Sequence, residues 1–141
     1  MSLWILDTDN FSLLQRGNLG IRKQITTIKP QEIAITIISA EEQIRGRLSI
    51  IRRASAADKL VLAYRRLNEL LEDLETINVL DFTPEASLIY DDLVRQKIHI
   101  GTRDLRIAAI ALAVKATVVT GNQRDFEKVS GLKLEDWTVE D

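Results

Sequence analysis

Short apolar runs alternate with longer amphipathic stretches along the chain. The apolar runs are rich in β-branched residues and end at turn or cap residues, which is typical of buried strands. They predict strands at residues 3–7, 32–37, 77–82 and 116–120, with an edge strand at 132–138.

Between these runs, apolar residues recur at three- and four-residue steps, which predicts helices. The first helix runs through Phe11 and Leu14 to about Gly17, and Pro30 stops the second. Further helices are expected after Ser39, over 54–77, from Pro84, over 103–115 and near 122–128. Strands separated by helices indicate an α/β fold, with a mostly parallel sheet of four to five strands between two helical layers.

The longest predicted helix carries a single apolar stripe, formed by Leu60, Tyr64, Leu67, Leu71 and Leu74. Such a stripe is typical of a core-facing surface or a dimer face. The arginine pairs at 52–53 and 65–66 are expected on solvated helix faces.

Composition narrows the possible chemistry. The 141 residues suit one domain, residues 1–141, and the net charge of −2 neither indicates nor excludes nucleic acid as a ligand. The absence of cysteine excludes disulfides and thiolate metal sites, and the single histidine, His99, excludes zinc sites built from several histidines. Any metal must therefore be held mainly by oxygen, which favours Mg²⁺ or Mn²⁺.

No apolar run approaches the length of a membrane span, and the N-terminus has no pattern of a secretory signal. We therefore expect a cytosolic protein with no membrane partner.

Four acids lie at places that a parallel sheet brings together. Asp7 ends the first strand, Glu42 follows the second, Asp104 begins a helix and Asp125 follows the fourth strand. Ligands of such sheets bind beyond the carboxyl ends of the strands. Clustered carboxylates repel one another unless a cation compensates them, so the pattern predicts a divalent metal site. Three neighbours are weaker candidates for the same site: Asp9, Thr120 and Asn122.

Each acid also has a purely local interpretation. Ser39 and Glu42 fit a capping box, with Ser39 as the N-cap. Asp104 and Asp125 fit the first turns of helices, where they would interact with the helix dipole, and Asp9 fits the N-cap of the first helix.

Three segments resemble the PIN domain, and within it the VapC-type toxin ribonucleases. LWILDTDN resembles the family's first strand with its acid, Asp7, and TIISAEEQIRG resembles its second motif, in which the acid lies four residues before a glycine and is therefore Glu42. The segment IGTRDLRIAAIALAVKATVVTGNQRDF resembles the block that supplies the last two acids, Asp104 and Asp125.

The resemblance implies a PIN-like, Rossmann-like α/β/α sandwich and an endoribonuclease that depends on Mg²⁺, with Mn²⁺ as an alternative. It implies Asp7, Glu42, Asp104 and Asp125 as the catalytic metal ligands. It also implies an RNA substrate, a VapB-type antitoxin and a homodimer. Basic residues near the motifs are candidates for RNA phosphate contacts: Arg16, Arg45, Arg47, Arg103 and Arg124.

Two other functions compete with this one. Asp7-Thr8-Asp9 also resembles the acid pair of haloacid-dehalogenase-like phosphatases, with Asp7 as the nucleophile, although Phe11 stands where that family has Thr or Val. A catalytically silent PIN-like domain that only binds RNA or protein would be expected to have lost at least one of the four acids, and all four are present.

Overall fold

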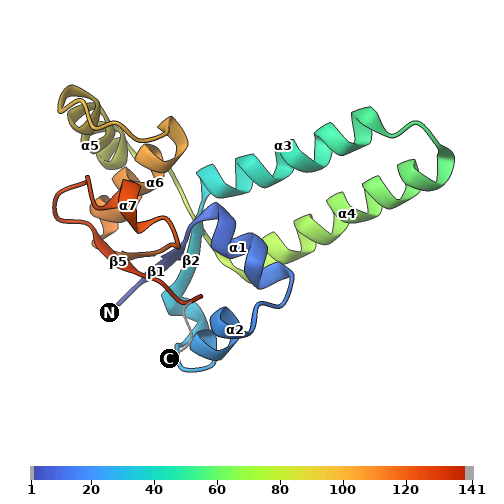
Figure 1. The fold of residues 1–141 in the computed structure, drawn as a ribbon, viewed down its shortest axis with the longest axis horizontal. Helices are drawn as coiled ribbons and strands as arrows, with labels where there is room; N and C mark the ends of the chain where they lie inside the picture. Colours follow the sequence, from blue (N-terminus) through green and yellow to red (C-terminus); the bar gives the residue numbers. More distant parts are fainter. Residues whose placement is uncertain (1, 139–141) are drawn as a thin grey trace.

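The computed structural model describes residues 2–138, which contain one five-stranded sheet with helices on both sides (Figure 1). All neighbouring strands are parallel, in the order β3-β2-β1-β4-β5. The strands are β1 (Trp4–Leu6), β2 (Ile33–Thr36), β3 (Asn78–Leu80), β4 (Thr117–Val119) and β5 (Lys133–Glu135). Each predicted strand is present, shorter than its apolar run.

Side chains alternate between the two faces of the sheet, as the two-residue repeat of a strand requires. In β1, Ile5 packs into one hydrophobic cluster and Leu6 into the other, and in β4 the same holds for Val118 and Val119. Both strands are therefore buried on both faces, which is the burial expected of central parallel strands.

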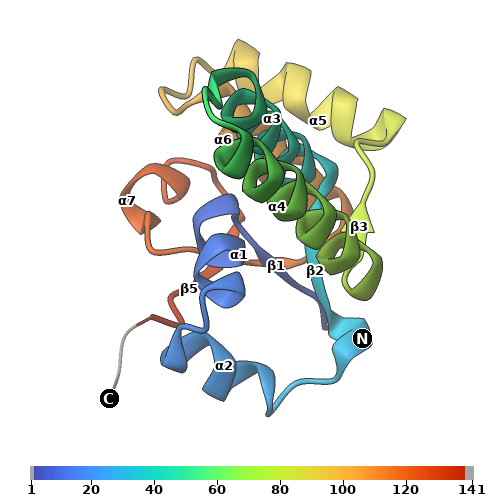
Figure 2. The ribbon, with the colours of Figure 1, turned by 90° about the vertical axis from the view of Figure 1, so that its right-hand side faces the viewer.

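Helices form the two outer layers (Figure 2). One layer contains α5 (Pro84–Arg95), α6 (Thr102–Val114) and α7 (Gln123–Phe126). The other contains α1 (Thr8–Gln15), α2 (Leu19–Ile25) and α4 (Ala57–Thr76), and α3 (Ile37–Arg53) contributes residues to both hydrophobic clusters. The predicted α/β/α sandwich is confirmed.

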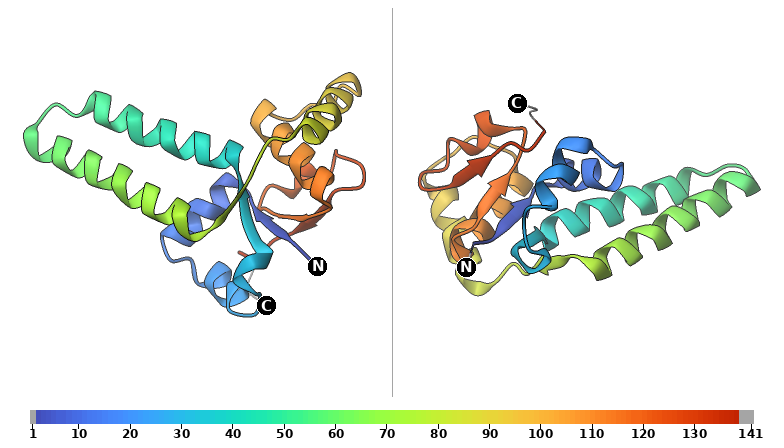
Figure 3. Two further views of the ribbon diagram at one scale, coloured as in Figure 1. Left: turned by 180° about the vertical axis from the view of Figure 1, so that it is seen from behind. Right: turned by 90° about the horizontal axis from the view of Figure 1, so that it is seen from below.

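Helices α3 and α4 form a hairpin that extends away from the sheet, and we call it the arm (Figures 1 and 3). The arm has eight exposed large hydrophobic side chains: Ile37, Leu48, Ile50, Leu60, Val61, Leu62, Tyr64 and Leu71. The buried positions of α4 are Ala63 and Leu70. The expected stripe is therefore divided, because Leu67 and Leu74 are partly buried whereas Leu60, Tyr64 and Leu71 face solvent.

Two predicted helix caps are wrong. The N-cap of α3 is Thr36, whose hydroxyl accepts a hydrogen bond from the backbone N–H of Ser39 at 3.3 Å. The helix therefore begins two residues before Ser39, and Glu42 cannot belong to a capping box. The N-cap of α1 is Asp7 and not Asp9, because Asp7 Oδ1 accepts a bond from the backbone N–H of Asn10.

Across the described residues, no helix combines the length and the apolar character that crossing a membrane requires.

Candidate active site

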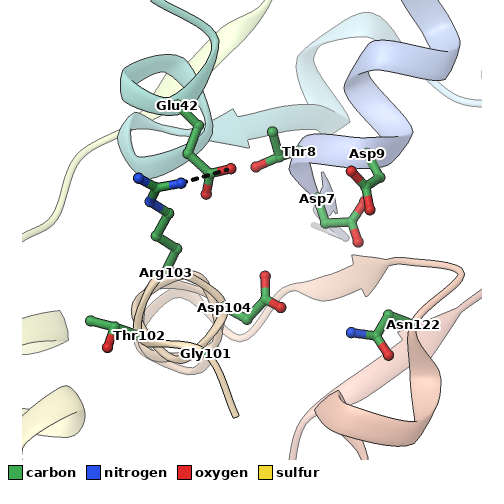
Figure 4. Close-up of a pocket in the computed structure, with 9 residues that line it drawn as sticks. All are labelled: Asp7, Thr8, Asp9, Glu42, Gly101, Thr102, Arg103, Asp104 and Asn122. Atoms are coloured by element: carbon green, nitrogen blue, oxygen red, sulfur yellow. Dashed lines mark ion pairs between the residues drawn. The ribbon is translucent and has the colours of Figure 1, made fainter. Parts of the chain in front are cut away.

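The candidate active site is a cavity of about 450 Å³ at the carboxyl ends of the central strands. Figure 4 shows the carboxyl groups of Asp7, Glu42 and Asp104 turned toward the same space. The lining residues come from the start of α1, from α3, from the start of α6 and from the loop after β4: Asp7, Thr8, Asp9, Glu42, Gly101, Thr102, Arg103, Asp104 and Asn122.

Asp7 is fixed in position by its neighbours. Only 5% of its surface is exposed, and its Oδ1 accepts hydrogen bonds from Asn10 N at 2.8 Å and Asn10 Nδ2 at 2.9 Å. Burial raises the pKa of Asp7, and hydrogen bonds from Thr120 and Asn10 oppose this rise. The carboxyl group thus has a defined orientation together with a substantial cost of ionisation.

Glu42 reaches the cavity from the second turn of α3. Burial raises its pKa, and the positive charge of Arg103, whose Nη1 lies 3.9 Å from Glu42 Oε2, lowers it in part. One turn earlier, Ser39 Oγ accepts a hydrogen bond from Thr8 Oγ1 at 2.9 Å, which connects the starts of α1 and α3. This contact fixes the position of Asp7 relative to Glu42.

Asp104 has the most perturbed ionisation in the cavity. Burial, together with the negative charges of Asp7 and Glu42, raises the pKa of Asp104 to about 6. The residues that follow on its helix face, Ile107, Ala108 and Ala111, are fully buried. A rigid helix therefore presents a carboxyl group that the other acids repel.

Asp125 does not line the cavity. Its Oδ2 accepts a hydrogen bond from Asn122 Nδ2 at 3.0 Å, and Lys128 Nζ lies 3.6 Å from its Oδ1. The Asn122 bond and the charge of Lys128 lower the pKa of Asp125. Asn122, by contrast, lines the cavity, and its backbone N–H donates to the buried Thr120 hydroxyl at 2.9 Å. Asp125 thus adjoins the site through Asn122.

The donor chemistry of the cavity fits Mg²⁺. Its acidic lining residues are Asp7, Asp9, Glu42 and Asp104, and all of their ligand atoms are oxygens. No three of the described acidic or histidine side chains lie close enough to hold an ion by themselves. This arrangement still suits Mg²⁺, because Mg²⁺ usually keeps several waters and binds only one or two carboxylates.

The five arginines predicted to contact RNA have different surroundings. Arg103 lines the acidic cavity, and Arg45 forms an exposed ion pair with Glu41 at 3.0 Å. Arg124 follows Asn122 on the surface and helps to lower the pKa of Asp125. Arg16 and Arg47 line a second cavity, between α1, α3 and α4.

The model of one protein family, the PIN domain, matches residues 4–132, which is most of the chain. The chain belongs to the PIN-domain family. This PIN domain is 29% identical to the tRNA(fMet)-specific endonuclease VapC of Salmonella typhimurium, over 97% of this chain and 99% of that protein. A match to Ribonuclease VapC2 of Rickettsia felis is 37% identical and covers 45% of this chain, but the chain spans only about half (51%) of that relative.

A solved structure agrees with these relatives. DNA-bound VapBC from Salmonella typhimurium superposes with a TM-score of 0.78, at 25% identity, over 97% of this chain and 99% of that chain. The resemblance to VapC-type PIN domains that the motifs predict is thereby confirmed. The comparisons give no support to the haloacid-dehalogenase-like phosphatase or to the silent binding domain.

Two residues that position the site are missing from the sequence-based prediction. Asn10 holds Asp7, and Thr8 lines the cavity and connects α1 to α3. The spacing Asp-x-x-Asn, typical of an N-cap followed by a first turn, is the signal that identifies Asn10. Thr8 has no comparable signal, because its partner, Ser39, is distant in sequence.

Proposed function

We propose that the chain, as a single PIN domain, is a cytosolic Mg²⁺-dependent endoribonuclease, the toxin of a VapBC-type toxin–antitoxin pair. The observation that most supports this proposal is the acidic cavity at the sheet edge, where ionisation of Asp104 is opposed by Asp7 and Glu42. Relatives named as ribonucleases and as a tRNA(fMet)-specific endonuclease support RNA as the substrate.

In this proposal, Asp7, Glu42 and Asp104 hold the metal directly or through water, and Asp125 completes the site from its margin. Bound Mg²⁺ would supply charge neutralisation at the phosphodiester and a more acidic water. Asn10 keeps the Asp7 carboxyl group oriented. Arg103 limits the negative charge at Glu42, and Asn122 and Thr120 shape the side of the cavity next to Asp125.

The test is RNA cleavage by the purified full chain with Mg²⁺ and with EDTA. We expect cleavage only with Mg²⁺, and a loss of about 100-fold or more in the Asp104→Asn variant, since that change removes a ligand charge without changing side-chain size. Asp91→Asn is the matched control, because Asp91 is an exposed acid on α5, outside the cavity. Cleavage that survives EDTA or Asp104→Asn would contradict the proposal.

We further propose that a VapB-type antitoxin binds the arm and that the toxin forms a homodimer. Support for the partner comes from the similarity to a VapBC complex. Support for the surface comes from the exposed side chains of the arm, such as Val61 at 62% and Tyr64 at 56% exposure. Clustered apolar surface of this kind is typical of protein–protein interfaces.

A further inference from the structure

A row of polar contacts leads from the acidic cavity along the α1–α3 interface. It begins with the Thr8–Ser39 hydrogen bond and continues one turn later, where Gln43 Nε2 donates to Ser12 Oγ at 2.7 Å. One further turn along α3 lies Arg47, which lines the second cavity. At a rise of about 1.5 Å per residue, the second cavity lies roughly 10 Å along α1 from Thr8.

The second cavity has a volume of about 450 Å³ and lies between α1, α3 and α4. Three guanidinium groups and two carboxylates line it, together with polar and apolar residues: Ser12, Gln15, Arg16, Arg47, Ile50, Arg66, Glu69, Leu70 and Asp73. The carboxylates already have partners, because Glu69 accepts from Arg66 at 3.2 Å and Asp73 accepts from Gln15 at 3.1 Å.

Arg47 has an unused donor at this cavity. Its Nε is buried and lacks a hydrogen-bond partner among the described residues. A buried donor on a charged group is costly to leave unpaired. Arg47 itself lines the cavity, and a guanidinium group matches a phosphate with two parallel hydrogen bonds.

We propose that the second cavity binds a backbone phosphate of the RNA substrate, held by Arg47 and Arg16, with Arg66 at its rim. This inference rests on the proposed ribonuclease function and gives that function a substrate-holding site. The acidic cavity needs such a site, because its lining contains one cation, Arg103, and that cation is paired with Glu42. Phosphates on either side of the cleaved bond must therefore find positive charge elsewhere.

RNA is favoured over an acidic protein segment because the second cavity lies on the same two helices, α1 and α3, as the acidic cavity, roughly 10 Å along α1 from Thr8. A strand that crosses the acidic cavity and follows α1 reaches Arg47 within a few nucleotides. In this arrangement, the phosphate contact fixes the register of the strand relative to Asp104.

The experiment measures binding of a fluorescent single-stranded RNA oligonucleotide to the full chain in the Asp104→Asn background, with Mg²⁺, over a range of salt concentrations. We expect Arg47→Gln and Arg16→Gln each to weaken binding about tenfold. The slope of log affinity against log salt should fall by about 0.7 for each lost phosphate contact. This change of slope separates lost phosphate binding from a general structural defect.

Arg52→Gln is the matched control, since Arg52 is an exposed arginine on the same helix that lines neither cavity. It should bind within twofold of the parent, with the same slope. If Arg47→Gln unfolds the chain by circular dichroism, Arg16→Gln on the opposite wall decides the outcome.

If both variants keep the RNA affinity and the salt slope of the parent, the second cavity does not bind a phosphate of RNA and the proposal is overturned. The same result is expected if the cavity instead receives a carboxylate of a partner protein. That result would leave Mg²⁺-dependent cleavage by the wild type intact. A parent that binds no RNA would instead count against the ribonuclease function itself.

Discussion

At the scale of single residues, Asp7 is both the N-cap of α1 and a wall of the acidic cavity. Its Oδ1 is held by two donors of Asn10, so the carboxyl group is oriented by the helix that it begins. The local interpretation and the functional one therefore do not compete at this position. Capping supplies the orientation that a metal ligand needs.

Asp104 should make the metal-free protein less stable above pH 6. Its folded-state pKa of about 6 exceeds the ordinary 3.8, so the folded state resists ionisation. The penalty is present above pH 6 and disappears as the pH falls toward 3.8. Asp104→Asn should therefore raise the free energy of unfolding in EDTA at pH 8 by about 1 kcal/mol, after allowance for solvent screening.

The measurement is urea denaturation of wild type and Asp104→Asn at pH 8 and at pH 4.5. The stability gap should narrow at the lower pH, and Mg²⁺ at pH 8 should stabilise the wild type more than the variant. A variant that is less stable than the wild type at pH 8 would show that Asp104 is not repelled by the other acids.

Which residues meet at the site could be predicted only in part. Asp7, Glu42 and Asp104 converge because parallel strands bring their carboxyl ends to one edge, and this follows from the order of strands and helices. The sequence predicts Arg66 on a solvated helix face and does not predict the second cavity that Arg66 lines. Arg66 lies there because α4 packs along α3, and helical periodicity does not specify how a hairpin packs.

At the scale of elements, α4 shows why an apolar stripe did not identify the packed face. The helix packs through Ala63 and Leu70, and the small Ala63 allows close approach to α3. A pattern of large residues emphasises Leu60, Tyr64 and Leu71, which are 40–56% exposed. Small residues at a helix–helix contact produce no signal in such a pattern.

Replacing either of two helical glycines with alanine should change the stability of the fold, in opposite directions at the two positions. A Cβ at Gly20 in α2 would lie 2.6 Å from the backbone oxygen of Trp137, whereas a Cβ at Gly46 in α3 would meet nothing within 4 Å. We expect Gly20→Ala to lower the free energy of unfolding by about 1–3 kcal/mol, because the added methyl group overpacks this contact. Gly46→Ala should raise the free energy of unfolding by about 0.5–1 kcal/mol, because alanine has the higher helix propensity.

Thermal denaturation of the two variants checks this pair. Gly20→Ala should also loosen the segment after β5, which would increase the fluorescence change of the buried Trp137 on mild heating. Equal effects of the two substitutions would contradict the close approach of α2 to Trp137.

At the scale of the whole molecule, the proposed partner surface on the outer part of the arm lies outside the acidic cavity. Val61→Glu or Tyr64→Glu should leave the fold and RNA cleavage intact, because both side chains are exposed and lie outside the two cavities. Either change should weaken association with the proposed VapB-type antitoxin by about tenfold or more, since a charge replaces apolar contact surface.

Co-purification and titration with that antitoxin provide the measurement. Leu88→Glu is the matched control, because Leu88 is 70% exposed on α5, away from the arm. If Leu88→Glu lost association and the arm variants kept it, the partner would bind the helical layer that contains α5, and the proposal for the arm would be wrong.

The central place of β1 in the sheet has a consequence for synthesis on the ribosome. β1 is made first, yet one of its two neighbours, β4, begins only at Thr117. At about 5–20 residues per second, the nascent chain waits roughly 6–20 s with that edge of β1 open. Asp7 and Asp104 come together only after α6 has emerged, so the acidic cavity is completed late in synthesis.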